Sequence, residues 1–143
     1  FDGYGPWAGE IRARHTGSLV SDRTGTVTPF AMIQLADRGI FFVEPGADTY
    51  EGMVVGINPR AEDLDINVTR EKKLTNMRQS SADVMETLAK PKKLDLEGAM
   101  EFCAGDECVE VTPEAVRVRK VHLSSTDRAR ERSRSKARDK ASL

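Results

Sequence analysis

The sequence has few of the residues that build metal or catalytic centres. Its only cysteines are Cys103 and Cys108, and its only histidines are His15 and His122. A structural zinc site needs four ligands, usually in two local pairs, and neither histidine stands beside a second ligand cluster. We therefore predict no metal site. The cysteines are expected as small buried apolar residues, one at a helix end and one at a strand start, and reduced thiols fit a cytoplasmic setting.

Motifs for nucleotide and nucleophile chemistry are also missing. There is no Gly-x4-Gly-Lys-Ser/Thr loop to cradle a triphosphate and no Gly-x-Ser-x-Gly turn. Asp63 and Asp65 lack the glycine and bidentate glutamate of a calcium loop, so we assign them to the wet face of a strand. No apolar run is long enough to span a membrane, and no secretory signal pattern occurs. We predict that this chain is not an enzyme, needs no cofactor and has no membrane partner.

What the chain does have is an uneven charge. Residues 117–143 hold ten Lys and Arg against three acids, or +7, which leaves −8 for residues 1–116 because the whole chain is −1. From Ser124 onward, no side chain is apolar and larger than Ala until Leu143. Such a segment cannot build a core, so we expect a disordered or frayed-helical tail that attracts RNA non-specifically. An acidic body with a basic tail indicates nucleic-acid contact.

The beginning of the chain predicts a linker. It opens without Met on residues 1–6, which are rich in Gly and turn-forming residues. We expect a fragment of a longer protein, with residues 1–13 as a linker from a preceding domain. Residues 14–123 are predicted to form one domain, and 124–143 the tail.

Short apolar runs between turn signals favour a mainly β domain of α+β character, an irregular antiparallel barrel-like sheet with one core helix. Residues 17–21 and 27–35 are predicted as strands joined by a hairpin turn, with Pro29 at a strand edge or bulge. Residues 53–57 are predicted to be the most buried strand. The remaining predicted strands are 40–43, 64–68, 109–111 and 115–121.

The one predicted core helix begins after Asp95, which can cap it, and ends near Gly105. Its buried face is expected to carry apolar residues spaced by helical turns. These are Leu96, Ala99, Met100 and Cys103.

Residues 72–82 form a basic, amide-rich segment with three cations and no acid. Lys and Arg neutralise phosphates, and Asn, Gln and Ser donate hydrogen bonds to them, so the segment suits a nucleic-acid backbone. A solvated surface loop is the alternative. In 115–121, Arg117 and Arg119 alternate with valines, which predicts an outer strand face that forms a second patch or merely faces solvent. The candidate RNA contacts are Lys72, Lys73, Thr75, Asn76, Arg78, Arg60, Arg70, Arg117, Arg119 and Lys120.

Four motifs, in this order and at these spacings, resemble the C-terminal region of the TypA/BipA family of ribosome-associated translational GTPases. The most specific is Lys-Lys-Leu-Thr-Asn-Met-Arg at 72–78. The others are Leu-Ala-Asp-Arg-Gly at 35–39, Tyr-Glu-Gly-Met-Val-Val-Gly-Ile at 50–57 and Val-Glu-Val-Thr-Pro at 109–113. The similarity runs from about residue 1 to residue 122.

The resemblance implies a ribosome-binding domain whose parent carries GTP and magnesium in an N-terminal domain absent from this chain. In the family, a long loop of this domain reaches toward the acceptor arm of A-site transfer RNA; here that loop is about 60–83. The expected partners are ribosomal RNA and A-site tRNA, in ribosome assembly or stress-adapted translation, and we expect a cytoplasmic monomer. The alternative is a protein-interaction module that docks a ribosomal protein or another domain of the parent.

Overall fold

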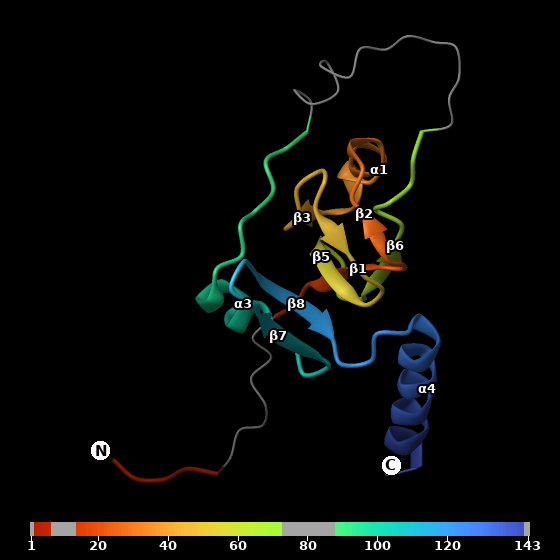
Figure 1. Ribbon diagram of the computed structural model, residues 1–143. Helices are drawn as coiled ribbons and strands as arrows, with labels where there is room; N and C mark the ends of the chain where they lie inside the picture. Colours follow the sequence, from red (N-terminus) through yellow and green to blue (C-terminus); the bar gives the residue numbers. More distant parts are fainter. Residues whose placement is uncertain (1, 7–13, 73–87, 142–143) are drawn as a thin grey trace.

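Strand β5, Met53–Asn58, lies at the centre of the main sheet in the computed structural model (Figure 1). The structure describes residues 2–6, 14–72 and 88–141. An unbroken apolar run such as Met-Val-Val is typical of a strand covered on both faces, and these three side chains are buried. The strand predicted at 53–57 is confirmed, but it is not the most buried strand, because β1, Gly17–Ser21, is buried at every residue while Ile57 of β5 is half-buried.

The main sheet has the order β6-β1-β5-β8-β7, and β3 pairs with the other half of β5. All neighbours are antiparallel except β1 and β6, which run parallel. A separate two-stranded sheet joins β2 to β4. The predicted mainly β, α+β fold is confirmed, and the main sheet stays open rather than closing into a barrel. The remaining strand bounds are β2 Gly25–Thr26, β3 Ile40–Phe41, β4 Asp48–Thr49, β6 Leu64–Ile66, β7 Glu107–Val111 and β8 Val116–Lys120.

The predicted strand over 27–35 is wrong. This stretch contains helix α1, Pro29–Gln34, which is followed by a 3-10 turn, η1, at Ala36–Arg38. The Thr28 side chain accepts a hydrogen bond from the N–H of Ala31 at 3.1 Å. Pro29 takes the first helical position, where its missing N–H leaves no bond unmade. The Thr-Pro pair therefore starts a helix, and β1 pairs with β5 instead of forming the predicted hairpin.

The sheet buries a separate apolar cluster on each face. Successive strand residues point to opposite faces, so Val55 faces the cluster under α1 while its neighbour Val54 faces the other cluster, under helix α3. The first cluster consists of Leu19, Val27, Met32, Phe41, Val43, Met53, Val55, Ile66 and Val68. The second consists of Val20, Val54, Ala99 and Val118.

Helix α3, Leu96–Phe102, is the predicted core helix, and Asp95 caps it by accepting the N–H of Gly98 at 2.8 Å. Its buried face differs from the prediction. Ala99 is fully buried, but Leu96 and Met100 are exposed. A helix of two turns meets the sheet along one narrow line, and here that line runs through Ala99 and Phe102.

Helix α4, Ser125–Ala141, follows β8 and occupies the segment expected to be a disordered or frayed-helical tail. Of those two alternatives, the structure has the helix. Figure 1 shows α4 at the end of the domain opposite to α1. Within residues 2–6, 14–72 and 88–141, no helix is long and apolar enough to cross a membrane.

Candidate nucleic-acid interface

The chain leaves the sheet after β6 along residues 67–72, here called the outgoing stem. Val68 is fully buried, and its carbonyl accepts the N–H of Thr28 at 3.0 Å. The Thr28 hydroxyl also donates to the carbonyl of Arg70 at 2.5 Å. The residue that caps α1 thus holds the backbone of the stem, while the side chains of Arg70 and Lys72 remain exposed.

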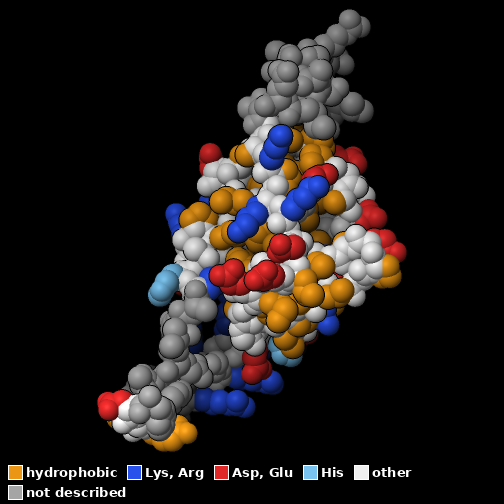
Figure 2. Space-filling view, turned by 90° about the vertical axis from the view of Figure 1, so that its left-hand side faces the viewer, with side chains coloured by type: hydrophobic (Ala, Val, Ile, Leu, Met, Phe, Trp, Pro, Cys, Tyr) orange, Lys and Arg blue, Asp and Glu red, His pale blue; other side chains and the backbone are white. Residues whose placement is uncertain are grey.

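The chain returns along residues 88–94, the returning stem, which has its own anchors. Leu88 packs against the first apolar cluster and Leu94 against the second. Between them the N–H of Lys92 donates to the carbonyl of Phe41 at 2.8 Å. Lys90, Lys92 and Lys93 are exposed, and Figure 2 shows Lys and Arg side chains in a row on this face.

The three lysines of the returning stem were not among the predicted contacts. Their signal was the run Lys-Pro-Lys-Lys at 90–93, which contains no acid. In Figure 1 the outgoing stem rises at the end of the domain that carries α1, and the returning stem runs from that end down to α3. We call Arg70, Lys72, Lys90, Lys92 and Lys93 the stem cations. Among the described residues, none of them forms an ion pair, so their charge is available to an anionic partner.

Four of the predicted contacts, Lys73, Thr75, Asn76 and Arg78, lie outside the described residues. Arg60 is exposed in the turn between β5 and β6. There it lines a small cleft with Asp37, Arg38 and Glu62 rather than joining the stem cations.

A cleft of about 580 Å³ connects the returning stem to β8, because Lys93 and Arg117 both line it. Its apolar lining includes Phe42, Val54, Val116 and Val118, and its acidic lining consists of Glu44, Asp48 and Glu114. The two cations at this cleft therefore stand among carboxylates, unlike the cations farther up the stems.

Arg117 and Arg119 share one face of β8, opposite to the face of Val118, as the alternation predicts. Both are half-buried. Arg117 lies directly across from Glu110 of β7. Glu110 also accepts the hydroxyl of Tyr50 at 2.5 Å, and burial, followed by this hydrogen bond, raises the pKa of Tyr50. Arg117 thus borders a carboxylate that is already hydrogen-bonded.

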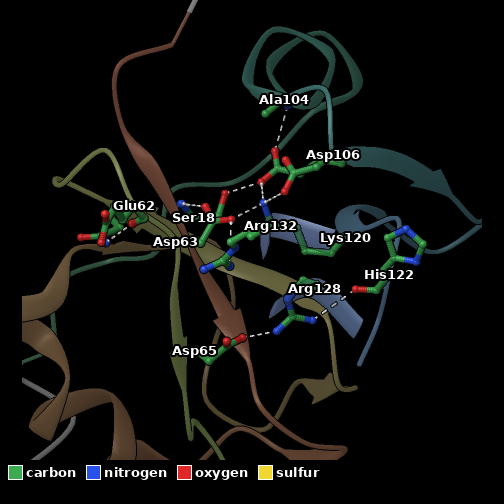
Figure 3. A network of polar contacts seen from close by, with 12 residues as sticks. Ser18, Glu62, Asp63, Asp65, Ala104, Asp106, Lys120, His122, Arg128 and Arg132 are labelled. Carbon is green, nitrogen blue, oxygen red and sulfur yellow. Dashed lines mark hydrogen bonds and ion pairs between the residues drawn. The ribbon is translucent and has the colours of Figure 1, made fainter. Parts of the chain in front are cut away.

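Lys120, predicted as an RNA contact, lies inside the domain rather than on its surface. Its side chain is 1% exposed, and its Nζ lies 2.6 Å from Asp63, 2.9 Å from Asp106 and 2.9 Å from Glu107. Figure 3 shows Asp63 and Asp106 turned toward this ammonium. Asp63 was expected on a wet strand face, but it serves this buried ion cluster. An ammonium held by three carboxylates has no free hydrogen to offer a phosphate.

Glu107 is the fully buried carboxylate of this cluster. Ser18 donates to it at 2.5 Å, the N–H of Ala104 at 2.9 Å, and Arg14 at 3.1 Å. Burial alone would raise the pKa of Glu107, but hydrogen bonds from Ser18, Lys120 and Ala104 outweigh it and lower that pKa. Burial would lower the pKa of Lys120, and its three carboxylates raise it instead. Both groups are therefore held in their charged forms.

Cys103 ends helix α3 and Cys108 lies in β7, the positions predicted, but both are half-buried and carry free thiols. Burial and the nearby Glu107 charge raise the pKa of Cys103, which disfavours its thiolate. Among the residues that the structure describes, no group of three or more His, Cys, Asp or Glu side chains could hold a metal ion.

Comparison with known proteins identifies residues 16–125 as a TypA/BipA C-terminal domain. The chain is 47% identical over 122 residues to the large ribosomal subunit assembly factor BipA of Salmonella typhimurium, covering 85% of this chain and 20% of that protein. It is 42% identical over 129 residues to the protein of the same name in Bacillus subtilis, covering 90% of this chain and 21% of that protein. The corresponding Synechocystis protein is 41% identical over 118 residues, with coverage of 82% and 20%. The chain thus spans about a fifth of the length of the curated relatives it matches, and it belongs to the TypA/BipA C-terminal domain family.

Proposed function

We propose that this domain binds ribosomal RNA through the stem cations and the basic segment that joins the two stems. The observation that carries the proposal is that five exposed cations, unpaired among the described residues, stand on backbone fixed by hydrogen bonds and apolar anchors. A backbone that is held in place beforehand loses little conformational entropy when the cations it carries meet a phosphate backbone. The names of the relatives, which describe assembly of the large ribosomal subunit, support the ribosome as the source of that RNA.

Within this proposal, the segment between the stems contacts the acceptor arm of A-site tRNA, with Lys72, Lys73 and Arg78 on phosphates and Thr75 and Asn76 as neutral donors. The parent protein is a cytoplasmic translational GTPase that acts in ribosome assembly or stress-adapted translation. This chain itself neither binds nor hydrolyses GTP, because its sequence has no phosphate loop. Calorimetric titration with GTP and magnesium should therefore be flat, and micromolar binding would contradict this part of the proposal.

The test of the RNA surface is K72A/K73A/R78A alongside K90A/K92A/K93A, with ribosome affinity measured at several salt concentrations. Each phosphate contact contributes about 0.9 to the slope of log affinity against log salt, and slightly less for a single strand. Each triple variant should therefore bind more weakly and lose about two to three units of slope. R23A/R38A is the control, since it removes exposed cations that lie on neither stem.

The competing function is docking to a protein, and the acidic, apolar cleft beside Lys93 is the feature that favours it. Ribosomal proteins are often basic, so salt dependence alone does not separate the two partners. A competing RNA does separate the two partners. If added RNA fails to displace the domain from ribosomes, or if both triple variants keep wild-type affinity and slope, the RNA proposal is wrong.

A further inference from the structure

Helix α4 is an element that the family match does not cover. The matched region ends at residue 125, where α4 begins. Its 17 residues contain seven Lys and Arg and three acids, a net charge of +4. No α4 residue belongs to either apolar cluster. The hydrophobic effect therefore does not explain why this helix rests on the domain.

Arg128 anchors the helix. Its side chain is 5% exposed, and its guanidinium bonds to the carboxylate of Asp65 and to the carbonyls of His122 and Leu123. Figure 3 shows this arginine between Asp65 of β6 and the turn that leads into α4. Arg132, one turn later, approaches Asp63 at 3.9 Å. Asp65, expected on the wet face of a strand, is thus the docking point of a second element.

Three further arginines of α4 face outward. Arg130, Arg134 and Arg138 recur every four residues, which sets them about 6 Å apart along one side of the helix. All three are exposed. Arg130 lies 3.4 Å from Asp127 and Arg134 lies 3.7 Å from Glu131, but both pairs are solvent-exposed and contribute little. Among the described residues, Arg138 has no ion-pair partner. We call these three residues the α4 stripe.

The amino-acid composition of α4 indicates what kind of partner this helix can bind. Protein interfaces depend on buried aromatic or aliphatic anchors, and α4 has no apolar side chain larger than Ala. Single-stranded nucleic acids are bound with aromatic side chains on which bases stack, and α4 has none. A row of guanidinium groups alone suits a continuous double-helical phosphate backbone, which is recognised by charge and shape.

We propose that α4 is a docked cationic arm that binds the phosphate backbone of double-helical RNA through the α4 stripe. The arm lies at the end of the domain opposite to α1 and the outgoing stem (Figure 1). It therefore adds a second contact surface to the proposed function and does not extend the first. Arg128 is the positioning residue, because it fixes the direction of the arm through Asp65 without facing the RNA.

The test measures binding of the whole chain to an RNA duplex of about 20 base pairs by fluorescence anisotropy at several salt concentrations. R130A/R134A/R138A should bind more weakly and lose about two to three units of salt slope. R130K/R134K/R138K keeps the charge and should keep most of the slope. Because Ala favours a helix at least as well as Arg, circular dichroism should show no loss of helix in the alanine variant.

Three outcomes would overturn the proposal. One is a wild-type slope for the alanine variant. Another is equal affinity for an acidic polypeptide of the same charge, which would make the arm a protein contact. The third is unchanged trypsin cleavage of α4 in D65N, which removes the anchor and keeps every cation, since a docked helix should be cut faster once released. The ribosome affinity of K90A/K92A/K93A is measured in parallel. If that variant binds ribosomes more weakly, the stem surface stands even when the proposal for α4 fails.

Discussion

The domain carries two basic surfaces, and they are held in different ways. The stem cations stand on backbone fixed by carbonyl and N–H bonds and by Val68, Leu88 and Leu94 in apolar clusters. Helix α4 is held by Arg128 on Asp65 and by the longer contact of Arg132 with Asp63. The first arrangement depends on burial, and the second depends on charge. Salt screens the exposed Asp65 and Arg132, whose side chains are 38% and 53% exposed, but barely affects apolar burial at moderate concentration. The two surfaces should therefore respond differently to salt.

The Lys120 cluster is joined to α4, because Asp63 contacts both Lys120 and Arg132. Replacing Lys120 with Met should produce the largest loss of stability. It leaves the buried Glu107 and the half-buried Asp63 without their shared cation, and breaking a buried pair in this way costs about 3–5 kcal/mol. Urea unfolding followed by circular dichroism measures the change. K93M, at an exposed position, is the control, and equal midpoints for the two variants would show that the cluster contributes no stability.

Acidification should act on the same cluster. The pKa of Glu107 is lower in the folded protein than its ordinary value of 4.5, so its charged form stabilises the fold above that value. This stability is lost as pH falls through the lowered pKa. Lys120 has a pKa raised above 10.5 and contributes fully below that pH. Unfolding midpoints measured from neutral pH to about pH 3 should fall on acidification, and E107Q should flatten the dependence.

Breaking the outgoing stem should cost less. Val68→Ala removes two methyl groups from a fully buried site, and at about 0.8 kcal/mol per buried carbon plus a cavity contribution the loss is about 2 kcal/mol. Because the interaction is apolar, this loss should be the same at low and high salt. A loss that shrinks with added salt would show that the stem, like α4, depends on charge.

Breaking the α4 anchor should change local order more than global stability. D65N should lower the unfolding free energy by only about 1 kcal/mol, because α4 buries no apolar cluster. The wild-type helix should also become easier to cleave as salt rises, and the variant should show little such dependence. Trypsin digestion at two salt concentrations checks this, with cleavage near the stems as the internal reference.

The smallest effect is expected for the stem cations themselves. K90A/K92A/K93A should keep the unfolding free energy within about 0.5 kcal/mol, since exposed substitutions away from caps and cores rarely do more. The same chemical denaturation experiment measures it. A larger loss would mean that these lysines hold the stem, and the stem surface would then differ less from α4 than the structure indicates.

Local signals in the sequence predicted much of the sheet. The apolar run of β5, the cap at Asp95 and the alternation in β8 each depend on neighbouring residues, and each prediction is confirmed. The helix at Pro29 was also signalled, by a Thr-Pro pair that suits a helix start. It was taken for a strand because Val27 to Leu35 is mostly apolar, and an apolar run of this length does not distinguish the two.

The contacts of the charged residues could be predicted only in part. Lys120 lies two residues after Val118 on the same strand face, so alternation indicates an inward side chain. It was nevertheless predicted as an RNA contact, because it stands beside Arg117 and Arg119 in the sequence. Its partners could not be found in this way, because Asp63 lies 57 positions earlier in the chain and is brought near only by the parallel pairing of β1 with β6. Arg128 and Asp65 are a similar case. The sequence shows which charges are present, but long-range strand pairing decides which of them meet.

The composition of the Lys120 cluster has a consequence for folding during synthesis. Its members span Arg14 to Lys120, so a nascent chain that stops before β8 holds Glu107 and Asp63 without their ammonium. Burying those carboxylates would then be unfavourable, and β5 would lack its pairing partner at Met53 and Val54. We therefore expect the domain to stay unfolded on a translating ribosome until β8 has emerged from the exit tunnel, and then to fold in one cooperative step.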